Sequence, residues 1–159
     1  MAQPCLFYRF SCNPLIFLLD YSYENINIQQ GILAHSDGDV VLHALCDALL
    51  GALALGDIGQ HFSDTDDANK NQNSAVFLDH IYSMITDKGY TLGNMDCTIH
   101  CERPKLRNHI DAMRENIAKL LNVDIDQISI KATRGEKMGY VGREEGVAAS
   151  VVVLLQKIK

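Results

Sequence analysis

The sequence predicts an α+β protein in which helices cover one face of a mixed β-sheet. The chain has 159 residues, 47% of them hydrophobic and 21% charged, which is typical of one globular domain. Its hydrophobic patterns follow the order strand, strand, helix, helix, strand, helix, strand, strand, and neither a linker nor an internal repeat divides it. We therefore predict a single domain over residues 1–159. The sheet face without helices needs another cover, and further copies of the chain are the simplest source.

The first third of the chain contains two strand candidates and a long helix. Residues 14–19 form a short apolar run and residues 25–29 a weaker one, so both are expected as strands. Ser36 and Asp39 have the spacing of a capping box, which predicts a helix from residue 36 to about residue 55. A loop rich in Asp and Asn follows, over about residues 56–73.

The remaining elements follow from helical spacing and from alternation. A second amphipathic helix is predicted over residues 74–88, where Gly89 ends it. A third helix is predicted over residues 107–121, and the expected strands are residues 95–101, 127–133 and 147–155. The last two strands are separated by a loop punctuated with glycines.

The composition argues against several classes of function. Fourteen Lys and Arg residues against 20 Asp and Glu give a net charge of -6, which is unsuited to nucleic acid. The apolar run at 14–19 is much shorter than the roughly 20 residues of a membrane span. We expect neither a secretory signal nor a transit peptide, because the first thirteen residues carry a single basic side chain, Arg9, and no small-residue cleavage pattern follows the run. The five cysteines form no C-x-x-C pair. We expect reduced thiols, a cytoplasmic location, and neither a membrane nor a nucleic-acid partner.

The first predicted helix is apolar on almost every face, but one stripe of polar residues runs along it. Asp39, His43 and Asp47 recur every four residues and therefore share a face. Each residue alone is explained by a capping carboxylate or a hydrogen-bonded core histidine. Together they favour a site in which His43 binds a metal and Asp47 orients its ring.

Several loops carry side chains suited to phosphate. His35 precedes a helix start, where backbone N–H groups attract anions, although a surface histidine is the plainer interpretation. Residues 56–59 and 62–66 combine glycines with carboxylates, which suits hydroxyls or cations but is also ordinary loop chemistry. Residues 103–107 place cations after a strand end, where solvated charge is the more common explanation. Residues 131–137 contain a hydroxyl, cations and one carboxylate, and Gly139, Gly142, Arg143 and Gly146 follow them. Together they form the best candidate for a cradle that holds a diphosphate and a divalent metal.

One family accounts for these segments in order. The motifs are A-H-S-D-G-D-V-V-L-H-A-L at residues 34–45, L-G-D-I-G at 55–59, F-S-D-T-D at 62–66, R-P-K at 103–105 and K-A-T-R-G-E-K-M-G-Y at 131–140. Over about residues 31–155 the chain resembles the 2-C-methyl-D-erythritol 2,4-cyclodiphosphate synthases of the non-mevalonate isoprenoid pathway. The resemblance implies a homotrimer with active sites between subunits. It also implies cyclisation of 4-diphosphocytidyl-2-C-methyl-D-erythritol 2-phosphate with release of CMP.

The resemblance also implies roles for individual residues. His35 would stabilise the transition state, His43 would be one of three zinc ligands, and Glu136 would hold magnesium or manganese on the diphosphate. The other implied substrate contacts are Ser36, Asp57, Ile58, Gly59, Phe62, Ser63, Asp64, Thr65, Asp66, Cys101, Glu102, Arg103, Pro104, Lys105, Leu106, Arg107, Thr133, Tyr140 and Arg143. Cytosine would lie against the segment 101–107, largely on backbone groups.

The chain departs from the family pattern at two places. The family has a zinc-binding Asp and His on its first strand, whereas counting back from His35 places Arg9 and Ser11 there, and residues 1–28 match poorly as a block. One histidine cannot supply the three protein ligands of a usual zinc site, so we expect weak zinc binding. Arg134 replaces a threonine that assists the transition state; it can pair with phosphate but cannot copy a hydroxyl. The alternative function is a non-catalytic trimer that retains at most nucleotide binding.

Overall fold

The computed structural model describes residues 5–8, 31–32, 37–63 and 72–158. Its strands and helices follow one another as β1 (Cys5–Tyr8), β2 (Gly31–Ile32), α1 (Val40–Ala52), α2 (Ile58–His61), α3 (Ser74–Asp87), β3 (Tyr90–His100), α4 (Ile110–Leu121), β4 (Ile128–Thr133), α5 (Gly139–Gly142) and β5 (Gly146–Lys157). Two 3-10 turns, η2 (Arg107–His109) and η3 (Ile125–Gln127), flank α4. No helix in these ranges has both the length and the apolar character needed to cross a membrane.

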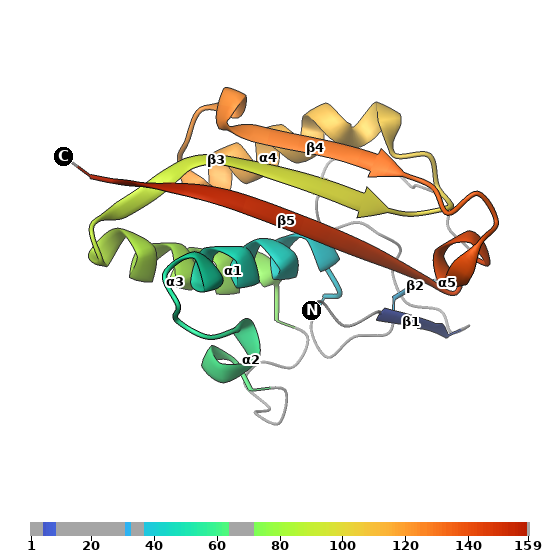
Figure 1. The fold of residues 1–159 in the computed structure, drawn as a ribbon, viewed down its shortest axis with the longest axis horizontal. Coiled ribbons are helices and arrows are strands. Elements are labelled where there is room, and N and C mark those ends of the chain that lie inside the picture. Colours follow the sequence, from blue (N-terminus) through green and yellow to red (C-terminus); the bar gives the residue numbers. More distant parts are fainter. Residues whose placement is uncertain (1–4, 9–30, 33–36, 64–71, 159) are drawn as a thin grey trace.

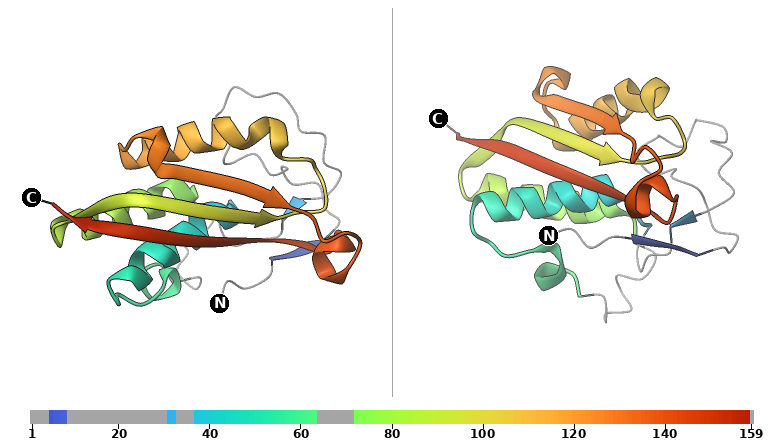
Figure 2. Two further views of the ribbon diagram at one scale, coloured as in Figure 1. Left: turned by 45° about the horizontal axis from the view of Figure 1, so that its top comes forward. Right: turned by 45° about the vertical axis from the view of Figure 1, so that its right-hand side comes forward.

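The strands form one mixed sheet in the order β2-β1-β5-β3-β4. The two long strands, β3 and β5, are antiparallel, while β4 lies parallel to β3. Helices α1, α3 and α4 lie on the same side of these strands, as Figures 1 and 2 show from three directions. The predicted mixed sheet with helices on one face is therefore confirmed.

Alternation along β5 shows which face of the sheet is buried. Val147 and Ala149 belong to the core, and the next alternate residues pack against it. The intervening residues Val152 and Leu154 are 72% and 61% exposed on the opposite face. The core thus lies between the sheet and the helices, and the other face carries exposed apolar side chains, as predicted.

Several predicted boundaries need correction. Helix α1 begins at Val40, later than expected, because Asp39 caps it by accepting from the backbone N–H of Val41 and Leu42 at 3.0 Å. Strand β3 begins at Tyr90, five residues earlier than expected, directly after the turn at Gly89. The strands expected at 14–19 and 25–29 lie outside the described residues. Helices α2 and α5 were not predicted, because four residues are too short to show a helical period.

Candidate functional site

The predicted polar stripe lies on α1, and its histidine faces the start of α3. His43 Nε2 lies 2.8 Å from Ser74 Oγ, and the His43 ring meets Phe77 edge-on with centroids 6.2 Å apart. Burial lowers the pKa of His43, and the nearby charges of Asp37 and Asp47 oppose this shift only in part. His43 is therefore held as a neutral imidazole near neutral pH.

Asp37 ties the starts of α1 and α3 together, a role that the sequence did not reveal. Its carboxylate accepts from the backbone N–H of Asp39 at 3.1 Å and of Ser74 at 2.7 Å, and also from the Ser74 hydroxyl. A serine hydroxyl has a single proton, so Ser74 Oγ then accepts from His43 Nε2–H. The lone pair of the His43 ring is consequently on Nδ1. Ser74 was not among the predicted site residues, and its only sequence signal is its position at a helix start.

The two carboxylates of the stripe have different environments. Asp39 is 7% exposed, and burial raises its pKa to about 7 despite the helix N–H groups that it accepts from. Among the described residues, its Oδ2 has no hydrogen-bond partner. Asp47 Oδ1 accepts from the Ile58 N–H at 2.8 Å and so fixes the start of α2 against α1. The idea that Asp47 orients the His43 ring stays a prediction.

The metal-binding prediction concerns residues inside the described ranges and residues outside them. Within the described ranges, no three His, Cys, Asp or Glu side chains are arranged to hold a metal ion. His43 is thus the one member of the implied zinc set whose surroundings are described. His35, Ser36, Arg9 and Ser11 lie outside the described residues. Among the described residues, His43 has no two further ligands of the kind that a three-ligand zinc site needs.

The segment after α1 forms a small capped unit. Asp57 caps α2 by accepting from Gln60 N–H at 3.0 Å and from Gln60 Nε2 at 2.9 Å, and the Gln60 side chain and backbone lower its pKa. Phe62 stacks on Phe77 with ring centroids 4.6 Å apart, so it supports the fold. Gly59 and Ser63 are exposed and Ile58 is half-buried, while Asp64, Thr65 and Asp66 lie outside the described residues.

The segment after β3 meets the loop after β4. Cys101 N–H donates to the Thr133 carbonyl at 2.9 Å, which continues the parallel pairing past the strand ends. The 5% exposed Glu102 accepts from Arg134 Nη2 at 3.2 Å and from Gly135 N–H at 3.0 Å. Burial alone would raise the pKa of Glu102, but Arg134 and the backbone N–H groups of the loop lower it. The segments expected to hold cytosine and phosphate are therefore neighbours.

The other predicted residues of these two segments lie around this contact. Arg103 pairs with Glu144 at 3.1 Å, across the loop, and a cis peptide bond joins Arg103 to Pro104. Arg143 pairs with Glu145 through two nitrogens, each at 2.8 Å. Leu106 belongs to the core, whereas Lys105, Arg107, Thr133 and Glu136 are exposed.

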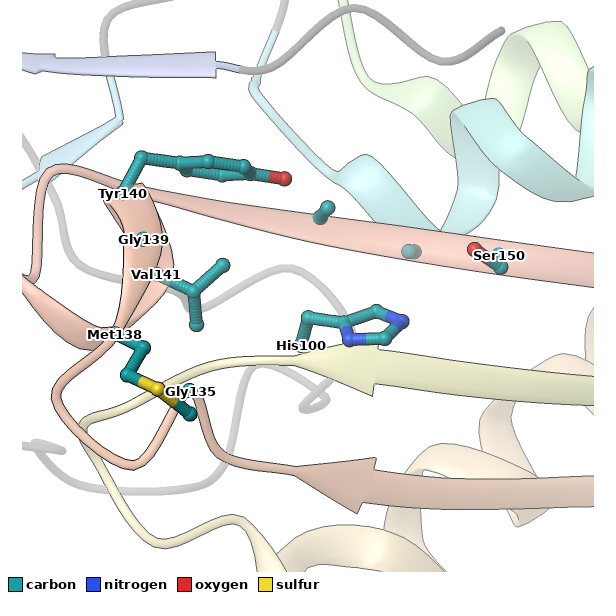
Figure 3. Close-up of a pocket in the computed structure, with 9 residues that line it drawn as sticks. His100, Gly135, Met138, Gly139, Tyr140, Val141 and Ser150 are labelled. Carbon is teal, nitrogen blue, oxygen red and sulfur yellow. The ribbon is translucent and has the colours of Figure 1, made fainter.

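A pocket of 520 Å³ lies where the ends of β3 and β5 meet the loop that carries α5. His100, Ser150, Met138 and Tyr140 line it, as Figure 3 shows. Its lining includes Tyr140 but none of the other predicted substrate contacts. The lining also includes Gly135, whose N–H donates to Glu102, so the pocket borders the Glu102 contact.

Comparison with known proteins gives consistent matches. The model of the YgbB family matches residues 23–156. A 2-C-methyl-D-erythritol 2,4-cyclodiphosphate synthase of Acinetobacter baumannii is 62% identical over 125 residues, which are 79% of this chain and 78% of that protein. A solved structure of such a synthase in a CDP-bound form has a TM-score of 0.80 at 33% identity and covers 97% of this chain and 96% of its own. The bifunctional IspDF of Campylobacter jejuni has a TM-score of 0.81 at 43% identity, over 84% of this chain and 36% of that longer one.

Proposed function

The chain belongs to the YgbB family, and we infer from this membership that it is an enzyme of isoprenoid precursor biosynthesis with the 2-C-methyl-D-erythritol 2,4-cyclodiphosphate synthase activity of its relatives. The substrate is 4-diphosphocytidyl-2-C-methyl-D-erythritol 2-phosphate. Its 2-phosphate attacks the β-phosphorus, so a new phosphorus–oxygen bond closes the ring. The bond between the β-phosphorus and the CMP oxygen breaks, and CMP leaves. Such a transfer depends on alignment and on neutralised charge.

The observation that carries this proposal is the contact between residues 101–107 and the loop after β4. Glu102 and Arg134 join the two segments at 3.2 Å, so a ligand that lies along one reaches the other. We place the cytosine on residues 101–107 and the diphosphate near Thr133 and Glu136. The CDP-bound state of a similar synthase supports this class of ligand.

The experiment is a turnover assay of the full chain with the diphosphocytidyl substrate. Phosphorus NMR should show the substrate signals replaced by those of a cyclic diphosphate and CMP. CDP binding without any CMP release would instead support the non-catalytic trimer. The comparisons do not favour that alternative, because a relative of 62% identity is named as the synthase.

We propose that magnesium or manganese binds at Glu136 together with the diphosphate. Glu136 is exposed at the loop after β4, and a single carboxylate together with phosphate oxygens suits magnesium or manganese. The metal would neutralise diphosphate charge, while Glu136 holds it at this loop. Titration with Mn²⁺ should therefore show tighter binding in the presence of CDP, and Glu136→Gln should remove that gain.

For zinc, we propose weak binding or none, since His43 alone is insufficient and positions 9 and 11 are Arg and Ser. Elemental analysis of the chain purified without chelators tests this, beside a variant with Arg9→Asp and Ser11→His. The unaltered chain should hold well below one zinc, and the double variant should hold more. One zinc per unaltered chain, with no gain from the double change, would show that other side chains complete the site.

We also propose that the enzyme is a homotrimer whose sheets face a central axis. The support is the exposed apolar pair Val152 and Leu154 on the sheet face without helices. Sedimentation velocity at micromolar concentration should give three times the 17.7 kDa mass of the chain. A stable monomer would rule out an active site shared between subunits.

The cysteines support a reducing compartment. Cys46, Cys97 and Cys101 are buried free thiols, and burial raises the pKa of each. Such thiols are neutral and unreactive, and none of the three is paired. We therefore place the enzyme in the cytoplasm.

A further inference from the structure

Glu102 is a buried carboxylate, and its partners among the described residues come from the loop after β4. Its side chain is 4% exposed, and its two oxygens accept from Arg134 Nη2 and from Gly135 N–H. A buried carboxylate is tolerated only where donors of this kind surround it. Glu102 is therefore fixed in place, and the groups bonded to it are fixed relative to β3.

Arg134 has the opposite exposure. Its side chain is 45% exposed, so one edge of the guanidinium meets Glu102 while a large part of the side chain faces solvent. A guanidinium carries five N–H donors, and one contact with a carboxylate leaves donors for a second anion. Arg134 also lies between Thr133 and Glu136, where we have placed the diphosphate.

Two other arginines of this region, Arg103 and Arg143, are held differently. Arg103 and Arg143 pair with Glu144 and Glu145, and the side chains in both pairs are 46% exposed or more. Exposed pairs of this kind contribute little and rearrange readily. Of these three arginines, only Arg134 is paired with a buried carboxylate, that of Glu102, which does not move into solvent with it.

We propose that Glu102 is a positioning residue that orients Arg134 to bind the terminal phosphate of a cytidine diphosphate ligand. This inference rests on the proposed function, because it places the nucleotide between residues 101–107 and the loop after β4. It assigns Arg134 to binding the β-phosphate, and it assigns to Glu102 an effect that acts only through Arg134. Cytidine monophosphate lacks the β-phosphate and therefore does not use this contact.

The test is the ratio of the dissociation constants for CMP and CDP, measured by calorimetry on the full chain at constant magnesium. Arg134→Gln should weaken CDP binding about tenfold and leave CMP binding within about twofold, as expected for one charge-assisted hydrogen bond. Glu102→Gln should reduce the same ratio by a smaller factor. In the Arg134→Gln background, Glu102→Gln should not change the ratio further.

Lys119→Gln is the matched control, because it removes an exposed positive charge on α4, away from the loop. It should leave both dissociation constants unchanged. Thermal unfolding of each variant checks that it is folded. If Glu102→Gln does not fold, Arg134→Gln and Arg134→Lys still test the contact, since Arg134 is at the surface and lysine keeps the charge without the planar fork.

The outcomes separate the inference from the proposed function. If the unaltered chain binds neither nucleotide, nucleotide binding at this crevice is wrong and the inference falls with it. If the unaltered chain prefers CDP but Arg134→Gln keeps that preference, the inference alone is overturned. It is also overturned if Glu102→Gln changes the ratio equally with and without Arg134.

Discussion

Asp39 makes the stability of the protein depend on pH in an unusual direction. Its carboxyl is buried at the start of α1, and its pKa rises from 3.8 to about 7 because burial disfavours the charged form. Between pH 3.8 and about pH 7, Asp39 has lost its proton in the unfolded chain but keeps it in the folded chain. Stability therefore falls as the pH rises from about 4 to about 7, and the contribution of this group is constant above that range.

The size of the effect follows from the shift. Each pKa unit corresponds to roughly 1.4 kcal/mol, so ionising Asp39 in the folded state costs about 4 kcal/mol. Asp39→Asn removes this cost, because asparagine cannot ionise. Asparagine also caps a helix about as well as aspartate, so the N–H groups of Val41 and Leu42 keep an acceptor.

Urea denaturation at several pH values between 4 and 8 measures the effect. The free energy of unfolding of Asp39→Asn, minus that of the unaltered chain, should increase by about 4 kcal/mol over this range. A constant offset from the buried amide does not affect that difference. Asp79→Asn removes an exposed carboxylate of α3 and serves as the control. A pH-independent difference for Asp39→Asn would refute the argument that burial keeps this carboxyl protonated.

Two further predictions concern close packing and the contact between helices. In a thermal unfolding assay, Gly142→Ala should destabilise the chain by about 1–3 kcal/mol, because a Cβ there would lie 2.3 Å from the Lys137 carbonyl carbon. Gly51→Ala, on an exposed turn of α1 with nothing within 4 Å, should instead stabilise it by about 0.5–1 kcal/mol in the same thermal unfolding assay. Ser74→Ala should cost about 1–3 kcal/mol in urea denaturation, because it leaves a carboxylate and an imidazole without their shared hydroxyl. Ser83→Ala on the exposed face of α3 is its control and should have little effect; equal costs would contradict the assigned role of the buried hydroxyl.

The long elements could be predicted because their periods are long enough to be seen. Helix α3 (Ser74–Asp87) matches the predicted 74–88, and β5 (Gly146–Lys157) extends the predicted 147–155 by one or two residues at each end. The start of α1 was misplaced because two residues could serve as its cap, and the sequence does not show which one accepts the helix N–H groups. In the structure Asp39 accepts them.

The contacts of the candidate site depend on topology that no local pattern contains. Asp37 meets Ser74 across 37 positions, and Glu102 meets Arg134 across 32. The second contact follows once β3 and β4 are known to be parallel with His100 opposite Thr133. Parallel strands bring their carboxyl ends to the same edge, so the residues that continue each strand emerge side by side. Glu102 is two residues past His100 and Arg134 one residue past Thr133, which is why a carboxylate and a guanidinium from separate motifs meet at this edge.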